Sequence, residues 1–401
     1  MIISPILVTG LAALIGALAM MYSFGRRGGK LWLGGLLGAA GGGLGASLFM
    51  VPLEYCTFEE ARRPIDQALG GVLVVAGMLI VLLPTNWIAS RLFWRQRVVS
   101  DGVHAPAHGL FKGWLTPLIF LLPTLTILIT FLYYPSLDTL RLSTRLARLG
   151  ARREVFVCVD NFTRLVELPA YIDTVGRTLF MSAMIVVLSM SLALLVALVA
   201  YLPIRGATVY RTLLIWPYGI SPAVAGIIFL LMFNPTGGII NHLTNDLLGF
   251  KIGWTNDPAV APWTIILASV WKSMGFNILF YIAGLQNVPR DLLEAAAIDG
   301  ANVVQRFRNI LLPLLSPITF FLIVTNVTYA VFETYATIDY LTPGGGPLQS
   351  TTTMMYDVIQ LGVANNDLGK AAAQSIVLFM LVIGLTLVQF RVSGRRVTFG
   401  A

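Results

Sequence analysis

The sequence predicts an all-α membrane protein that crosses the bilayer many times. Of its 401 residues, 57% are hydrophobic and only 11% are charged, whereas soluble domains carry roughly 25% charged residues. The apolar residues also gather in long runs, and about 20 consecutive apolar residues suffice for one membrane helix. Composition and run length together exclude a soluble globular fold.

Nine apolar runs are long enough to be membrane helices, and we number them as predicted spans one to nine. They cover residues 3–23, 31–51, 67–89, 114–134, 178–202, 212–233, 263–286, 310–332 and 372–390. The first has no basic residue before it and Arg26, Arg27 and Lys30 after it, the reverse of a secretory signal peptide. We therefore expect it to remain in the membrane.

The distribution of charge predicts which loops are cytoplasmic. The loops after spans one, three, five and seven, with the C-terminus, hold 15 of the 27 Lys and Arg residues but only 4 of the 19 Asp and Glu residues. Positive residues favour the cytoplasmic side of a membrane. The pattern predicts an external N-terminus, nine spans and a cytoplasmic C-terminus, and it accounts for the net charge of +8 without a nucleic-acid partner.

Two features fall on the predicted outer side. The loop over 135–177 must be external by span count although it is rich in arginine, with five acidic residues among the arginines. Its arginines are Arg141, Arg145, Arg148, Arg152, Arg153, Arg164 and Arg177. Cys56 and Cys158 also lie on this side, where a disulfide could persist; two unpaired thiols are the alternative.

Predicted span two is rich in glycine, with seven glycines between Gly34 and Gly45. Gly34, Gly38 and Gly42 recur at four-residue spacing, which lets two membrane helices approach closely. The helix face that carries these three glycines could be a docking face for another subunit. Packing against predicted spans one and three of the same chain is the interpretation we favour.

A polar, basic linker, "RLFWRQRVVSDGVHAPAHGLFKG", follows predicted span three. Its proline and glycine residues are typical of a loop. The linker divides the chain into a three-helix extension, residues 1–110, and a six-helix core, residues 111–401. It contains His104 and His108, but Pro106 between them disfavours a helical metal site, so we predict no metal.

No motif in the sequence indicates an enzyme. A phosphate-binding loop of the form G-x-x-x-x-G-K-[ST] is absent, and Gly369-Lys370 is followed by Ala371. Cys/His clusters, a G-x-S-x-G motif and paired carboxylates within a span are absent as well. We therefore predict no catalytic residues and no cofactor in this chain, and any ATP that drives it must be bound by another chain.

A polar segment, "NVPRDLLEAAAIDGANVVQRFRNILLP" over residues 287–313, separates predicted spans seven and eight. Asn287 is suited to a helix N-cap and Pro289 to a first turn. Asp299-Gly300 should end this helix, and a second should begin near Asn302. The exposed alanines could fit a groove on a partner, with Glu294 facing a cation at its edge; a loop lying on the membrane surface is the alternative.

The stretch "EAAAIDGANVVQRFRNILLP" resembles the EAA motif of the permease subunits of bacterial ATP-binding-cassette importers. That motif reads E-A-A-x-x-D-G-A, then about nine residues, then a hydrophobic residue and proline. The matching residues are Glu294, Ala295, Ala296, Asp299, Gly300, Ala301 and Pro313. The resemblance implies that this segment is the coupling helix that seats in a cleft of the ATPase, with Glu294 in contact with it.

The resemblance covers roughly residues 112 to 393 and includes "LLIWPYGISPAVAGIIFLLMFNP", "PGGGPLQSTTT" and "AAAQSIVLFMLVIGLTLVQFR". Within the carbohydrate-importer group that also holds MalF, it is similar to the UgpA type of glycerol-3-phosphate permeases. It implies a MetI-like permease fold in the bacterial inner membrane. It also implies a second homologous permease, an ATPase dimer that binds ATP and magnesium, and an external solute-binding protein. The three-helix extension departs from the usual six-span form.

Predicted span seven contains candidate solute-binding residues. Lys272 lies about 14 Å from its outer end at 1.5 Å per residue, and a lysine near the midplane costs about 2.5 to 3.5 kcal/mol. Such residues usually face a cavity or a partner charge. Ser273 and Asn277, one turn apart, and Trp271 could contact sugar hydroxyls and rings. Lysine would suit a phosphate, but its presence does not decide the substrate.

Predicted spans six and eight add four candidates. In "WPYGISP" two prolines interrupt the helix, and such a break is tolerated mainly beside a cavity or inside protein; it contains Tyr218 and Ser221. Asn326 and Tyr329 share one face of span eight. Resemblance to the maltose permease places sugar-contacting positions near Tyr218, Ser221, Ser273 and Tyr329. Interhelical hydrogen bonding is the alternative role for each polar residue.

The sequence therefore favours a transmembrane subunit of an ATP-dependent, binding-protein-dependent importer. It would form half of the translocation pathway for a sugar or sn-glycerol-3-phosphate. The alternative is a secondary transporter driven by an ion gradient, which requires intramembrane carboxylates. Only Glu333, at the edge of predicted span eight, approaches that requirement.

Overall fold

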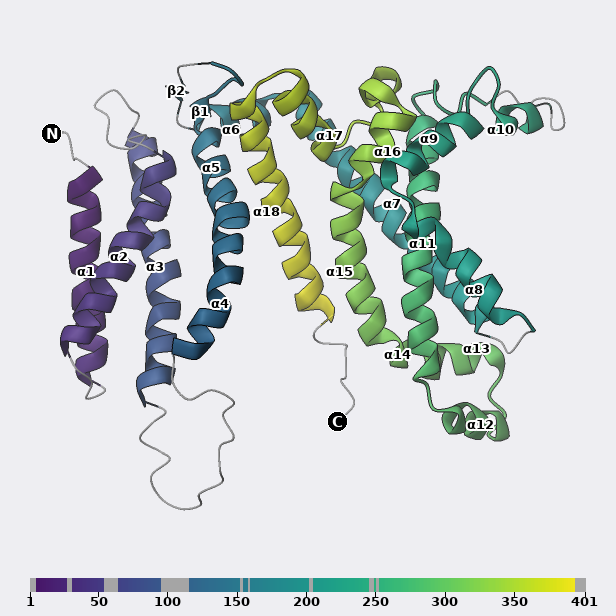
Figure 1. Cartoon of the computed structure of the whole chain (residues 1–401), viewed down its shortest axis with the longest axis horizontal. Helices are drawn as coiled ribbons and strands as arrows, with labels where there is room; N and C mark the ends of the chain where they lie inside the picture. Colours follow the sequence, from purple (N-terminus) through teal and green to yellow (C-terminus); the bar gives the residue numbers. More distant parts are fainter. Residues whose placement is uncertain are drawn as a thin grey trace. The chain divides into compact units, whose positions relative to one another are not determined.

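The computed structural model describes residues 5–26, 31–53, 64–94, 115–151, 154–157, 159–201, 205–244, 249 and 252–393. These residues are mostly helical (Figure 1). They form two compact units: unit 1 is Met1–Arg164 with Asn365–Ile376, and unit 2 is Leu165–Ala364 with Val377–Ala401. Cys56, Cys158, His104, His108 and the predicted domain boundary at residue 110 lie outside the described residues.

Unit 1 begins with three helices packed in sequence order. Its elements are α1 (Pro5–Arg26), α2 (Leu31–Leu53), α3 (Pro64–Trp94), α4 (Leu115–Leu128), the π-helical turn η2 (Ile129–Tyr133), α5 (Tyr134–Ser143), β1 (Arg145–Leu146), β2 (Val155–Phe156) and most of α6 (Asp160–Glu167). The two short strands pair antiparallel. Their hairpin carries arginines of the predicted outer loop, and Glu154 accepts hydrogen bonds from Arg141 and Arg145 at 3.2 and 3.1 Å.

The glycines of α2 allow close backbone contact with α1. A side chain at Gly38 or Gly42 would lie against the backbone carbonyl of Gly16 or Ala12, and one at Gly34 would lie 2.9 Å from the Met20 carbonyl oxygen. Farther along α2, a side chain at Gly45 would lie 2.6 Å from the carbonyl oxygen of Gly77 in α3. The favoured interpretation, packing within the same chain, is confirmed.

This packing predicts unequal effects of two glycine substitutions on α1. Gly16→Ala places a methyl group against the backbone of α2, and such overpacking costs about 1 to 3 kcal/mol. Gly10→Ala is the matched control, because a side chain there meets nothing within 4 Å. Hydrogen exchange of the purified chain should be faster across α1 and α2 in Gly16→Ala only. Equal exchange in the two variants would contradict this packing.

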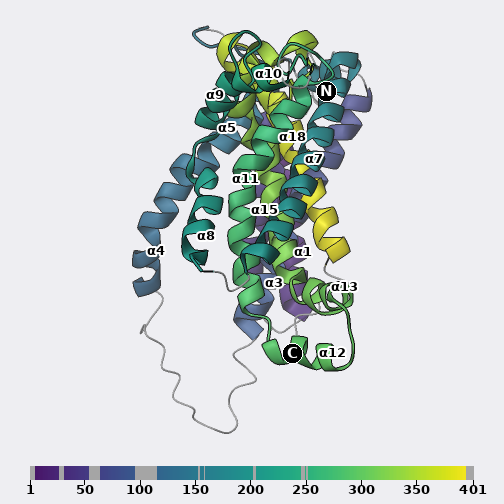
Figure 2. The same ribbon diagram turned by 90° about the vertical axis from the view of Figure 1, so that its right-hand side faces the viewer.

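Unit 2 holds the helices of the predicted importer core. Its elements are α7 (Pro169–Ala200), α8 (Ala207–Ile215), η3 (Trp216–Gly219), α9 (Pro222–Met232), α10 (Ile239–His242), α11 (Ala261–Gln286), α12 (Arg290–Ile298), α13 (Val303–Arg306), η5 (Phe307–Leu311), α14 (Leu312–Leu314), α15 (Ser316–Phe332), α16 (Thr334–Leu341), η6 (Pro343–Gly345), η7 (Pro347–Gln349), α17 (Met354–Ile359), η8 (Gln360–Ala364) and most of α18 (Leu368–Ser393). Helices α7, α11 and α15 share a core that includes Ile185, Ile278 and Leu322. Figures 1 and 2 show α12 and α13 at one end of this unit and α10 at the other.

Each of the nine predicted apolar runs is mostly helical in the described residues, and span six is interrupted at Ile220 and Ser221. Within the part of the chain that the structure describes, six helices are long and apolar enough to cross a membrane, or seven if the bent pair Ala207–Gly219 and Pro222–Met232 is one span. The 100° bend of that pair lies within "WPYGISP", where the sequence predicts an interruption. The chain is thus a multi-pass helical membrane protein, and the count of nine spans with its orientation stays a prediction.

Three predicted span boundaries were wrong. The helix of span four continues through η2 and α5 to Ser143, and α7 begins at Pro169, because both helices extend beyond their apolar stretches into polar sequence. Span eight is shifted: its long helix begins at Ser316, after the short α14, and continues to Leu341. Pro317 occupies the first turn of α15, where proline is tolerated. Glu333, at the junction of α15 and α16, therefore lies inside the candidate span Ser316–Leu341 and not at its edge.

Candidate functional site

The predicted coupling segment forms a helix, a tight turn and a second helix. α12 ends in a Schellman motif: Ala301 N–H donates to the Ala296 carbonyl at 2.9 Å and Gly300 N–H to the Ala297 carbonyl at 3.2 Å. Gly300 has φ +80°, which glycine adopts without strain. Asn302 then caps α13 in a reciprocal capping box with Gln305. The predicted turn and second helix start are confirmed.

The first cap was predicted at the wrong residue. Asn287 is the C-cap of α11, and Pro289 is the N-cap of α12. Because α11 continues to Gln286, Asn287 ends that helix and does not begin the next one. Asp291 lies in the first turn of α12, near the positive end of its dipole.

The predicted coupling segment exposes apolar side chains at its surface. Ile298 is 87% exposed, and Val303 and Val304 are 73% and 69% exposed. Glu294, Ala295 and Asp299 are exposed on α12, Ala296 is partly buried, and Pro313 lies in α14. Glu294 makes no ion pair with any residue that the structure describes. Exposed apolar residues beside an unpaired charge are typical of a protein contact surface.

A second feature of unit 2 is a pocket between η3, α11 and α15. Its volume is about 130 Å³, and it is lined by Tyr218, Ser273, Phe276, Thr325, Asn326 and Tyr329. The aromatic rings of Tyr218 and Phe276 lie 5.1 Å apart. Hydroxyl and amide groups on an aromatic wall are suited to a hydroxylated solute, because rings stack on carbon faces while polar groups pair with hydroxyls.

The break between α8 and α9 positions Tyr218 at this pocket. Gly275 of α11 lets η3 approach, since a side chain there would lie 2.9 Å from the Ile215 carbonyl oxygen and 3.1 Å from Tyr218 Cβ. Ser221 caps the next helix, its hydroxyl accepting a hydrogen bond from Val224 N–H at 3.3 Å. Ser221 therefore has a local structural role and does not line the pocket.

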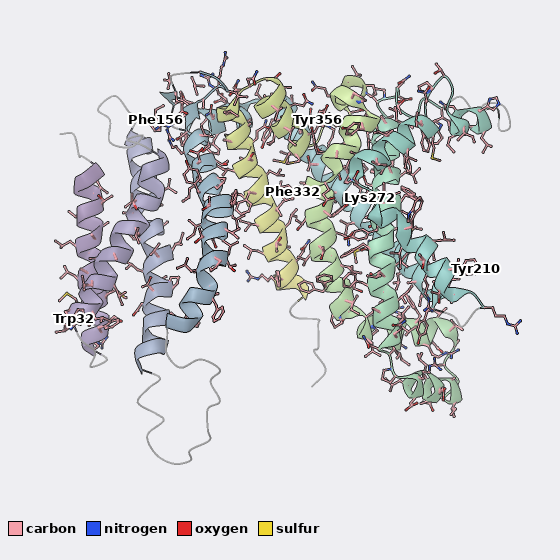
Figure 3. The ribbon with its side chains drawn as sticks, viewed as in Figure 1. Trp32, Phe156, Tyr210, Lys272, Phe332 and Tyr356 are labelled. Atoms are coloured by element: carbon pink, nitrogen blue, oxygen red, sulfur yellow. The ribbon has the colours of Figure 1, made fainter. Side chains whose placement is uncertain are left out.

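Lys272 lies beside the pocket, within the body of unit 2 (Figure 3). The residue is 4% exposed. Its Nζ atom is 4.4 Å from the ring centroid of Tyr329 and 5.9 Å from that of Tyr218, within the range of cation–π attraction. Nζ also lies 3.8 Å from Glu333 Oε2. The buried charge is thus surrounded by two pocket tyrosines and one carboxylate.

Asn277 and Asn326 join α11 to its neighbours. Asn277 Nδ2 donates to Ser189 Oγ at 3.3 Å and to Asn326 Oδ1 at 3.2 Å, and Asn326 Nδ2 donates to Asn277 Oδ1 at 2.7 Å. Ser273 Oγ donates to the Ser269 carbonyl at 2.8 Å. Trp271 packs on Phe229, with ring centroids 5.6 Å apart. Asn277 is fully buried in these contacts. It therefore has the alternative role that the sequence analysis left open, hydrogen bonding between helices.

The structure brings together only part of the predicted solute-binding set. Four members line one pocket, namely Tyr218, Ser273, Asn326 and Tyr329. Lys272 adjoins it, whereas Ser221, Asn277 and Trp271 contact other residues. Sequence reasoning missed Phe276 and Thr325, and it named Glu333 only as a carboxylate at the edge of predicted span eight. Glu333 is four residues after Tyr329, so a longer span eight would have placed both on one face.

The geometry can be compared with known proteins. The family model described as "Binding-protein-dependent transport system inner membrane component" matches residues 185–397. The sn-glycerol-3-phosphate transport system permease protein UgpA of Pectobacterium atrosepticum is 42% identical over 289 residues, which cover 72% of this chain and 97% of that protein. Its counterpart in Rhizobium meliloti is 40% identical over 294 residues, 72% of this chain and 98% of that protein.

Solved structures give the same fold. The crystal structure of a bacterial alginate ABC transporter, in complex with alginate pentasaccharide-bound periplasmic protein, matches with a TM-score of 0.63 at 20% identity, covering 72% of this chain and 96% of that chain. Among the described residues, no group of three or more His, Cys, Asp or Glu side chains could hold a metal ion. The chain belongs to the family of inner membrane components of binding-protein-dependent transport systems, and it is a UgpA-like permease subunit.

Proposed function

We propose that this chain forms half of the translocation pathway of an ATP-driven importer for a sugar or sn-glycerol-3-phosphate. A second, related permease supplies the other half, and an external solute-binding protein delivers the solute. The observation that carries the proposal is the exposed α12–α13 segment with its EAA residues at one end of unit 2. The substrate class is supported by the names of the UgpA relatives.

The α12–α13 segment is the proposed contact with the ATPase. Glu294, Ala295, Ala296, Asp299, Gly300, Ala301 and Pro313 would seat and orient it in a cleft of that subunit. Exposed Ile298 supports this role, since it gains from burial against a partner. ATP-driven closure of an ATPase pair draws two such segments together and opens the cavity outward, and hydrolysis resets it. ATP and magnesium stay on the ATPase.

The pocket beside Lys272 is the proposed solute contact of this half. Tyr218, Ser273, Asn326 and Tyr329 would contact the solute, with Trp271, Asn277 and Ser221 supporting the helices around them. Half of the Glu333 side chain is exposed, and ionisable groups at membrane depth rarely face lipid. The exposure therefore supports an aqueous pathway or a second permease on that side.

The proposed orientation places α12 and α13 in the cytoplasm and α10 outside a bacterial inner membrane. It rests on the excess of basic residues in the predicted cytoplasmic loops. The arginine-rich loop stays external in this orientation, and the ion pairs of Glu154 with Arg141 and Arg145 offset part of its charge.

One observation favours a secondary transporter as the second candidate: the Lys272–Glu333 pair within the spans. The two functions differ in their energy source, which reconstitution into vesicles tests directly. If the chain is part of an importer, vesicles that contain this chain alone should show no transport. Uptake should appear when both permeases, the ATPase, the binding protein and ATP are present. Uptake by the purified chain alone, driven by a proton or sodium gradient, would replace the importer with the secondary transporter.

A further inference from the structure

The ion pair beside the pocket is loose. Lys272 Nζ and Glu333 Oε2 are 3.8 Å apart, whereas a charge-assisted hydrogen bond measures about 2.7 to 2.9 Å. An ammonium group carries three donors. Within the described part of the chain, Glu333 supplies the only carboxylate that the ammonium reaches. Lys272 is therefore only partly satisfied by the described residues of its own chain.

The two partners differ in how firmly they are held. The Lys272 side chain is 5% exposed and lies over the rings of Tyr329 and Tyr218. The Glu333 side chain is 47% exposed and lies where α15 gives way to α16. No hydrogen bond joins its carboxylate to another described residue. Glu333 can thus turn toward solvent when another anion approaches Lys272, whereas Lys272 remains in place.

We propose that Glu333 is an exchangeable counter-ion that sets the charge preference of the pathway. A solute with a phosphate or carboxylate group takes the place of the Glu333 carboxylate at Lys272, and a neutral solute leaves the pair intact. The inference rests on the proposed function, and it assigns to Glu333 a specificity-determining role.

Space and charge both suit this exchange. The pocket that adjoins Lys272 holds about 130 Å³, roughly four water molecules at about 30 Å³ each, which is room for a small anionic group. Ser273 already donates its proton to Ser269, so its oxygen can accept a hydrogen bond from a solute hydroxyl. The exchange replaces one anion by another beside the buried ammonium, so Lys272 keeps a counter-charge. The displaced carboxylate belongs to a side chain that is 47% exposed, so solvent can take the place of the ammonium.

Titration of the purified full-length chain with inorganic phosphate, measured by isothermal titration calorimetry, tests the proposal. Glu333→Gln should bind phosphate about tenfold more tightly than the unaltered chain, because a competing carboxylate is gone. Glycerol, the neutral probe, should bind equally to both. Glu333→Asp keeps the charge on a shorter side chain and should show a smaller gain in phosphate affinity. It replaces Glu333→Gln in the test if that variant does not fold.

The matched control breaks a different lysine pair. Lys370 Nζ lies 3.0 Å from Asp367 Oδ2 in unit 1, and Asp367→Asn should leave phosphate binding unchanged. Lys272→Met combined with Glu333→Gln should abolish it. The proposal is overturned by unchanged phosphate affinity in both Glu333 variants, by absence of saturable binding in Glu333→Gln, or by phosphate binding that survives loss of Lys272.

Failure of this inference is distinguishable from failure of the proposed function. If the complete importer shows uptake that depends on the ATPase but the phosphate titration is negative, the proposed function is supported and the exchange at Lys272 is rejected. If the chain alone shows uptake driven by an ion gradient, the ATP-driven importer is rejected, whatever the result of the phosphate titration.

Discussion

Glu294→Lys should abolish solute uptake while the chain still inserts into the membrane. Glu294 is exposed on α12, outside every membrane span, so the substitution leaves the packing of unit 2 intact. At the proposed ATPase contact it replaces an attractive charge by a repulsive one. Losing one partner of a close interfacial charge pair costs about 2 to 5 kcal/mol, and each 1.4 kcal/mol is a tenfold loss of affinity. The ATPase should no longer co-purify.

Two variants separate the charge at Glu294 from general damage. Glu167→Lys makes the same reversal at an exposed glutamate of unit 2, at the end of α6, and should leave uptake and co-purification normal. Glu294→Gln removes the charge without reversing it and should give an intermediate loss. Normal ATPase co-purification and uptake in Glu294→Lys would show that α12 is not the coupling contact.

The positions of the helices followed from the sequence, but their ends did not. Runs of apolar residues located every long helix, because membrane helices need such runs. The same criterion failed where a helix leaves the apolar layer: α5 continues past Asp138 and Arg141, which pair at 3.5 Å one turn apart. It failed again at span eight, where the apolar run before Ser316 forms a short helix and a π-turn.

The site was predictable as a set of residue types but not as a geometry. Lys272 was predictable because a charge at that depth in a membrane is costly. The turn at Gly300 was predictable because the adjacent residues Asp299-Gly300 are themselves a turn signal. The pairing of Lys272 with Glu333 depends on the register of α11 against α15, which no local pattern encodes. The approach of Tyr218 to the pocket depends likewise on the absence of a side chain at Gly275, 57 positions along the chain.

The two halves of the Lys272–Glu333 pair should contribute unequally to stability. Glu333→Gln leaves a buried ammonium without a counter-charge, and breaking a buried pair this way costs about 3 to 5 kcal/mol. Because half of the Glu333 side chain is exposed, the pair is partly solvated and we expect about 2 to 3 kcal/mol. Thermal unfolding of the purified chain in detergent, without added phosphate, measures the difference.

Lys272→Met should be the milder substitution. It removes the charge that is costly to bury and keeps an unbranched apolar stem, although it forfeits a cation–π contact of about 0.5 to 2 kcal/mol with Tyr329. The carboxylate left behind is half exposed, so an aqueous pathway can solvate it, and the net cost should stay within about 1 kcal/mol. The opposite order of stability would mean that the abandoned Glu333 carboxylate meets the apolar part of the detergent rather than water. A carboxylate in such surroundings would argue against a solute pathway along this face of α15.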